Sequence, residues 1–182
     1  MRKSTLSFLK KFKDDDSATL TVEFILILPV LMTWFIGSIV FFDAFNSKAT
    51  AQRTAHTIAD IVSRQTSVDN SFVAELLVLQ NRMMPRVSVG SVRVSSIQRD
   101  LAGDLQMLWT RSTNIASTPL TMADIPLSQI PTVANGESVL MIDTSVPFVP
   151  ISDWIGFTAA NWENHVAISP RFVEPLPNTD FP

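Results

Sequence analysis

The chain has 182 residues, enough for one domain of ordinary size and a membrane anchor. Apolar residues make up 46% of it and charged residues 17%, a low charged fraction for a soluble domain. A net charge of -3, with no basic stripe between aromatic residues, argues against nucleic acid as a partner, and the absence of cysteine excludes disulfides and thiol chemistry.

The N-terminal part contains one long uncharged run, residues 24–42. An α-helix needs about 20 apolar residues to cross a hydrocarbon core, so we predict a transmembrane helix over 19–43. A cleaved secretory signal is the alternative, but its apolar core would be about 7–15 residues long. By the positive-inside rule, a basic leader keeps the N-terminus cytoplasmic and sends 44–182 across the membrane. The basic residues of this leader are Arg2, Lys3, Lys10, Lys11 and Lys13.

Two residues of this segment are unusual for a plain anchor. Pro29 lies inside the run, where it removes one helical hydrogen bond and predicts a kink that membrane helices tolerate. Glu23 stands at the start of the run, and a carboxylate in a bilayer is costly without a cationic or donor partner. Within one helical turn its polar neighbours are Thr19 and Thr21. Glu23 is therefore the functional candidate of the segment.

Apolar residues continue at helical spacing beyond the run. They predict one helix from Thr19 to Arg64, about 70 Å long. Its small alanine residues permit close packing, either on the chain's own domain or on a partner element, and the sequence leaves both open. The predicted inward face comprises Phe45, Ala49, Gln52, Ala55, Ile58, Ala59 and Val62, with Gln52 as its polar exception.

Residues 67–182 predict an α+β domain with an antiparallel sheet. The capping side chains of Ser67–Ser71 begin a second helix, which runs from Ser71 to about Met84 and ends before Pro85. Its predicted inward face comprises Phe72, Leu76, Leu79 and Met83.

Alternating apolar residues predict the strands of this sheet. Arg99–Asp104 is expected to be a hairpin connection, and 112–137 a loop with a helical turn within Leu120–Pro131. The strands are expected at Val87–Ile97 with a bulge near Gly90, at Leu105–Trp109, at Glu137–Phe148 and at His165–Phe172.

The sequence carries no pattern of an enzyme or a metal protein. His56 and His165 lie on different predicted elements, without the spacing that metal ligands require, so we predict no metal site. Asp143, Asp153 and Glu163 read as surface carboxylates. Phosphate-binding loops and hydrolase motifs are absent from the sequence, so we expect no catalytic residue, no cofactor and no enzymatic activity.

The stretch SATLTVEFILILPVL, residues 17–31, resembles the N-terminal segment of TadE/TadF-like pseudopilins, which belong to the tight-adherence (Flp-type) pilus machinery. In that family a small residue precedes a cleavage junction, and a glutamate with an aromatic residue follows within an apolar helix that often carries proline. Here the junction is Ala18–Thr19, Glu23 and Phe24 follow, and Pro29 lies in the helix. The family usually has glycine where this chain has Ala18.

This resemblance implies that a membrane prepilin peptidase removes residues 1–18. The net charge would become −3 − (5 − 3) = −5, and the new α-amine of Thr19 would lie one turn from Glu23. That amine, in the same or a neighbouring subunit, would pair with the carboxylate and set the register of an assembled helix bundle. The other implied partners are pilins and pseudopilins of the same pilus, the inner-membrane assembly platform and the lipid bilayer.

The function implied is that of a minor pilin or pseudopilin in assembly of tight-adherence pili, for surface adhesion and biofilm formation. The chain would be a single-pass protein of the bacterial inner membrane, with a pilin-like periplasmic domain and incorporation in the extracellular pilus. Its parts would be a cytoplasmic leader (1–18), a transmembrane helix (19–43), a periplasmic extension (44–66) and a periplasmic domain (67–182). The alternative is an uncleaved single-span anchor that displays a periplasmic binding or sensor domain.

Overall fold

The computed structural model describes residues 17–84, 90–113, 120–125, 127–151, 156 and 158–180, with the backbone alone at 17–20 and at 127. These residues form a long N-terminal helix, a short helix and a four-stranded antiparallel sheet, the α+β class that the sequence predicts. The helices are α2 (Ser17–Ser63) and α3 (Asn70–Met83), and the strands are β1 (Ser91–Arg99), β2 (Leu105–Thr113), β3 (Ser138–Phe148) and β4 (Ala160–Ile168).

The chain divides into two compact units. One comprises Met1–Asp43 together with Ile151–Phe157. The other comprises Ala44–Pro150 together with Thr158–Pro182 and contains all four strands and α3.

The predicted long helix is confirmed as α2, with ends that differ from the predicted ones by one or two residues. Pro29 lies inside this continuous helix. The inward face of its second half differs from the predicted one. Phe45 and Gln52 are exposed, whereas Ala44 is buried. The buried residues of the second half are Ala44, Ala51, Thr54, Ala55, Ile58, Ala59, Val62 and Ser63.

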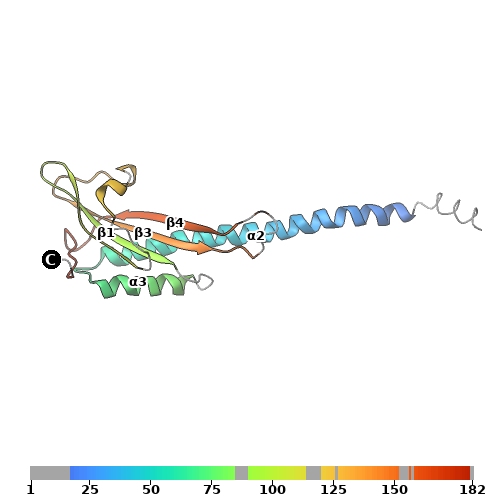
Figure 1. Cartoon of the computed structure of the whole chain (residues 1–182), viewed down its shortest axis with the longest axis horizontal. Helices are drawn as coiled ribbons and strands as arrows, with labels where there is room; N and C mark the ends of the chain where they lie inside the picture. Colours follow the sequence, from blue (N-terminus) through green and yellow to red (C-terminus); the bar gives the residue numbers. More distant parts are fainter. Residues whose placement is uncertain are drawn as a thin grey trace, which may run out of the picture. The chain divides into compact units, whose positions relative to one another are not determined.

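This buried face packs on the chain's own domain. Ala55, Ile58, Ala59 and Val62 belong to one apolar cluster with residues of α3 and of all four strands. Small residues on a helix let a neighbouring element approach its backbone closely, which explains why Ala44 points inward and the bulkier Phe45 outward. Figure 1 shows β3 and β4 running alongside this part of α2.

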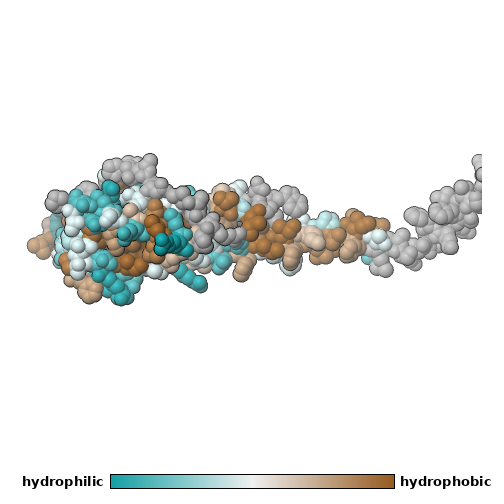
Figure 2. All heavy atoms as spheres, turned by 90° about the horizontal axis from the view of Figure 1, so that it is seen from below, coloured by the Kyte–Doolittle hydropathy of each residue, from teal (hydrophilic) through white to brown (hydrophobic). Residues whose placement is uncertain are grey.

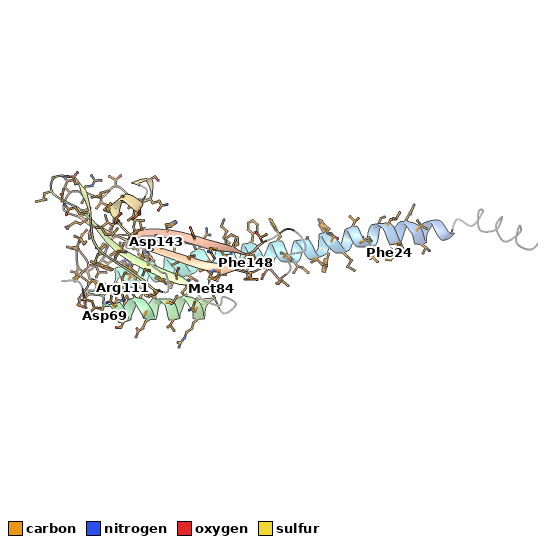
Figure 3. All side chains as sticks on the ribbon, viewed as in Figure 1. Phe24, Asp69, Met84, Arg111, Asp143 and Phe148 are labelled. Atoms are coloured by element: carbon orange, nitrogen blue, oxygen red, sulfur yellow. The ribbon has the colours of Figure 1, made fainter. Side chains whose placement is uncertain are left out.

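The helix α3 begins at the cap that the sequence predicts. Asp69 is the N-cap, and its Oδ1 accepts hydrogen bonds from the backbone N–H of Phe72 at 2.6 Å and the hydroxyl of Ser71 at 2.8 Å. Figure 3 shows Asp69 at this end of α3. The predicted inward face is rotated, because Val73, Leu76 and Gln80 are the buried residues of the helix. Pro85, the predicted terminator, lies outside the described residues.

The sheet has the strand order β2-β1-β3-β4, and every neighbouring pair is antiparallel. The side of the sheet that faces the helices carries the strand residues of the apolar cluster that contains Ile58, which is called the main cluster below. On the opposite side Ile97, Val139 and Met141 pack with Ile125 and Val133. These last two come from the connection between β2 and β3, which includes the 3-10 turns η1 (Met122–Asp124) and η2 (Leu127–Gln129). The strand residues of the main cluster are Val92, Val94, Trp109, Leu140, Ile142 and Val166.

Three of the four strand predictions are confirmed in position. The hairpin between β1 and β2 forms as expected, with the Gly103 N–H bonded to the Asp100 carbonyl at 3.1 Å. The irregularity of β1 lies between Ser96 and Ile97 in its pairing with β2, whereas the predicted bulge was near Gly90. Val87 and Val89 lie outside the described residues.

The last strand overlaps the predicted range His165–Phe172 only over His165–Ile168 and begins earlier in the chain. β4 covers Ala160–Ile168 and ends before Pro170, which has no N–H to donate to a neighbouring strand. The segment that follows instead packs against the connection between α2 and α3. The backbone N–H of Val68 donates to the carbonyl of Pro177 at 3.1 Å, and that of Thr179 donates to the Val68 carbonyl at 2.9 Å.

Candidate functional site

The first half of α2 is an exposed apolar surface. Most of its large apolar side chains from Val22 to Phe45 are 36% to 72% exposed, and a few turn inward. Figure 2 shows mainly hydrophobic side chains along this stretch, with a few paler ones between them. Soluble monomers rarely expose contiguous apolar patches larger than a few hundred Å². Within the described part of the chain, the helix over Thr21–Ser63 is the single one long and apolar enough to cross a membrane.

Polar side chains inside this surface bond to their own helix. The Thr33 hydroxyl donates to the carbonyl of Pro29 at 2.8 Å, and the Ser38 hydroxyl donates to the carbonyl of Trp34 at 2.9 Å. Such bonds satisfy a hydroxyl without water, as an apolar solvent requires. Both bonds run back by four residues, so neither needs a second element.

The predicted cleavage junction and the glutamate with its aromatic neighbour lie in the first turns of α2. Ala18 and Thr19 belong to its helical backbone, and Glu23 and Phe24 are exposed. Figure 3 shows Phe24 on the ribbon of this part of α2. In the backbone of the helix, Thr19 precedes Glu23 by four residues, about one turn. No described residue forms an ion pair with the Glu23 carboxylate.

Both histidines line one open hollow between α2 and β4. His56 and Arg53 come from the helix, and Glu163 and His165 from the strand. Sequence patterns placed the two histidines on different elements, and this is confirmed. The sequence patterns did not indicate that α2 and β4 lie next to each other, because 109 positions separate His56 from His165 (165 − 56). Among the described residues, no group of three His, Cys, Asp or Glu side chains is placed to hold a metal ion.

His165 belongs to a polar row across the outer face of the sheet. Its Nδ1 lies 2.8 Å from Oδ1 of Asp143, its directly opposed residue on β3, and Arg93 of β1 is opposed to Asp143 in turn. Figure 3 shows where Asp143 lies on β3. Among the described residues, Asp143 is the hydrogen-bond partner of the His165 ring. The three residues are directly opposed across three neighbouring strands, as cross-strand side-chain pairs are.

The loop beside this row carries a carboxylate with a lowered pKa. Hydrogen bonds from the backbone N–H and then the hydroxyl of Thr121 hold the pKa of Asp124 below its ordinary value, and the charge of Arg93 adds to the effect. The hydrogen bonds lie within η1 and its N-cap residue, and with the charge of Arg93 they account for the shift without a ligand.

The arrangement therefore offers an apolar helix with a carboxylate at its start and a sheet face with a row of polar side chains. The first fits a lipid or helix-bundle environment, and the second fits water. Comparisons of the chain with protein-family models, with curated proteins and with solved structures find no match.

Proposed function

We propose that the protein is a membrane-anchored structural subunit, a minor pilin or pseudopilin of a tight-adherence (Flp-type) pilus. The observation that carries this proposal is the position of Glu23 in the first turns of a 47-residue helix that is exposed and apolar in its first half and packed on a sheet in its second. Anchor and domain then share one continuous helix. A subunit that passes from a bilayer into a helical assembly needs such an element.

The bilayer supports the exposed half of α2 before assembly. Its length is sufficient, since the 19 residues of 24–42 rise about 28 Å against a hydrocarbon core about 30 Å thick. The sheet domain would lie on the side away from the basic leader, in the periplasm of a bacterial cell. Neighbouring subunits would replace lipid around the same apolar side chains in the pilus.

Glu23 supplies the register in this proposal. A prepilin peptidase that cuts Ala18–Thr19 would create an α-amine on the helix face that carries Glu23. An amine and a carboxylate that meet in an apolar bundle fix one axial alignment, because any other alignment leaves a charge buried without a partner. The amine can belong to the same subunit or to the next one.

One observation favours the second candidate, an uncleaved anchor that displays a periplasmic binding or sensor domain. The helix α2 begins at Ser17, so the Ala18–Thr19 bond lies within its first turn. Peptidases bind extended chains, and this turn would have to unwind before cleavage. The N-terminal sequence of the protein recovered from membranes separates the two candidates. Thr19 as first residue supports the pilin, and an intact leader supports the anchor.

The role of Glu23 is tested by Glu23→Ala in cells that form the pilus. We expect the variant to insert in the membrane at the normal level and to block pilus formation. Ser38→Ala is the matched control, because Ser38 is a polar residue of the same segment whose hydroxyl bonds to its own helix. Normal piliation with Glu23→Ala would contradict the proposal, and so would equal loss with both variants.

A further inference from the structure

A buried polar layer divides the interior of the sheet domain, on the side of the helices, into two apolar parts. The larger part is the main cluster, and the smaller one contains Ala51 of α2, Met84 at the end of α3 and Val146 of β3. Figure 3 shows Met84 at the end of α3 opposite to Asp69. Both clusters belong to the compact unit that contains the sheet.

The helix α3 crosses this layer at Gln80. Leu76 belongs to the main cluster and Met84 to the smaller one, and Gln80 lies four residues from each along the same side of the helix. Gln80 is 1% exposed. Its amide oxygen Oε1 is buried and has no hydrogen-bond partner among the described residues.

The strand β3 crosses the layer at Thr144. This residue lies between Ile142 of the main cluster and Val146 of the smaller one, and alternate residues of a strand share one side of the sheet. Thr144 is 3% exposed, and its hydroxyl has no partner within the described part of the chain. The Nε2 of Gln80 donates to the carbonyl of Ser145 at 3.2 Å, so the amide lies next to this part of β3.

The helix α2 crosses the layer at Thr54. This residue follows Ala51 of the smaller cluster by three positions and precedes Ile58 of the main cluster by four, so the three share the buried face of the helix. Thr54 is 1% exposed, and its Oγ1 is also buried without a partner in the described ranges. The three polar residues therefore lie at one level of the domain, between the same two clusters.

Three buried polar atoms at one level have a common partner in water. A buried hydroxyl or amide oxygen that is left unbonded destabilises the folded state, and buried polar groups in native proteins are bonded as a rule. A buried water molecule typically makes about three hydrogen bonds to groups that otherwise lack partners. It can donate to the amide oxygen of Gln80 and can bond to the hydroxyls of Thr54 and Thr144, each of which donates or accepts.

We propose that Thr54, Gln80 and Thr144 hold an ordered water molecule in the interior of the sheet domain, which ties α2, α3 and β3 together. The site gives the packed half of α2 one axial position on the domain. A shift of α2 by one turn would place the Thr54 hydroxyl among apolar side chains, where it has no partner. The inference concerns the sheet domain alone and is independent of membrane anchoring, cleavage and pilus assembly.

Thr54→Val and Thr144→Val test the site in the full-length protein, because valine keeps the shape of threonine and removes the hydroxyl. We expect each change to raise the unfolding equilibrium constant about 2- to 10-fold, as the loss of one hydrogen bond does. Urea unfolding followed by circular dichroism measures the change. An increase in stability with either variant would mean that its hydroxyl has no partner, and it would overturn the proposal.

Thr57→Val is the matched control. Thr57 is an exposed residue of the same helix, and its hydroxyl donates to the carbonyl of Arg53 at 2.9 Å. We expect a smaller change in the unfolding equilibrium constant than with Thr54→Val. An effect as large as that of Thr54→Val would show a loss common to any threonine of α2, and it would contradict the buried site.

A shared water molecule also couples the two buried hydroxyls. The variant with both changes should raise the unfolding equilibrium constant by less than the product of the two single effects. Effects that multiply would show that the hydroxyls act separately and would overturn the shared site.

A crystal structure of the full-length protein that shows ordered water separates a bound water from a direct contact. We expect density at about 2.5–3.0 Å from Oγ1 of Thr54, Oε1 of Gln80 and Oγ1 of Thr144. Direct hydrogen bonds among these side chains, with no water density between them, would overturn the proposal.

Discussion

The indole Nε1–H of Trp109 on β2 donates a hydrogen bond to the carbonyl oxygen of Leu176 at 2.8 Å, and both residues are buried. This bond joins an edge strand of the sheet to the C-terminal segment, 67 positions away. The same segment pairs with Val68 between the two helices. A single indole therefore helps to close the sheet domain around its main apolar cluster.

Trp109→Phe should lower the free energy of unfolding by about 1–3 kcal/mol, because it leaves the buried Leu176 carbonyl without its donor. Urea unfolding of the full-length protein, followed by circular dichroism, measures the loss. Trp162→Phe is the matched control, since the indole N–H of Trp162 is buried without a hydrogen-bond partner among the described residues. Equal losses from the two changes would mean that the Trp109 bond adds nothing to stability.

Ile58→Ala should lower the free energy of unfolding by about 2–5 kcal/mol, the usual cost of emptying a packed aliphatic site. Ile58 is completely buried on the face of α2 that packs on the domain. Gln52→Ala, on the exposed side of the same helix, should change it by about 0.5 kcal/mol or less. The reverse ranking in denaturant unfolding would show that this face of α2 is not packed on its own domain.

Gly90→Ala should destabilise the domain by about 1–3 kcal/mol, as overpacked sites usually do. A Cβ at this position would overlap Nε2 of Gln80, a buried amide that donates to the Ser145 carbonyl at 3.2 Å. The side chain of Gln80 would have to move and would lose this bond.

A double-mutant cycle with Gln80→Ala tests this mechanism. Removing the glutamine side chain leaves room for the new methyl group, so the double variant should lose less stability than the sum of the two single losses. Thermal or urea unfolding of the four proteins gives the coupling energy. Strict additivity would rule out the overlap as the cause.

The N-cap of α3 gives the domain a predicted dependence on pH. The N–H of Phe72, followed by the hydroxyl of Ser71, holds the pKa of Asp69 below its ordinary value. A carboxyl whose pKa is lower in the folded state stabilises it above the unfolded pKa, and the contribution disappears as pH falls through the folded pKa. The carboxylate should therefore stabilise the domain at neutral pH and stop doing so in the acid range below about pH 4.

Asp69→Asn isolates this contribution, because asparagine retains an oxygen that can accept the Phe72 N–H but does not titrate. The parent protein should be the more stable of the two at pH 7, and the difference should shrink as the pH falls below the unfolded pKa. Unfolding curves recorded from pH 7 to pH 2 measure it. A difference that stays constant over this range would show that the carboxylate charge has no role in the cap.

Patterns local in sequence predicted the elements well. The length of the uncharged run, the capping residues near Asp69 and the alternation in β1, β2 and β3 each depend on neighbouring residues, and these elements lie where expected. The last strand was misplaced because its apolar residues continue past Pro170 into a segment that packs as irregular chain. The row of Arg93, Asp143 and His165 had no local signal, since its members lie on three strands.

The sequence by itself determined the long apolar helix, the position of Glu23 at its start and the α+β domain after it, because charge, length and periodicity are properties of the chain. Within the described residues this helix is the one long and apolar enough for a membrane. The tertiary structure alone decided which side of each element faces inward. Ala44 rather than Phe45, and Gln80 rather than Leu79, became buried because close backbone approach and a distant carbonyl acceptor select the inward residue. Both conditions exist only after the elements have packed.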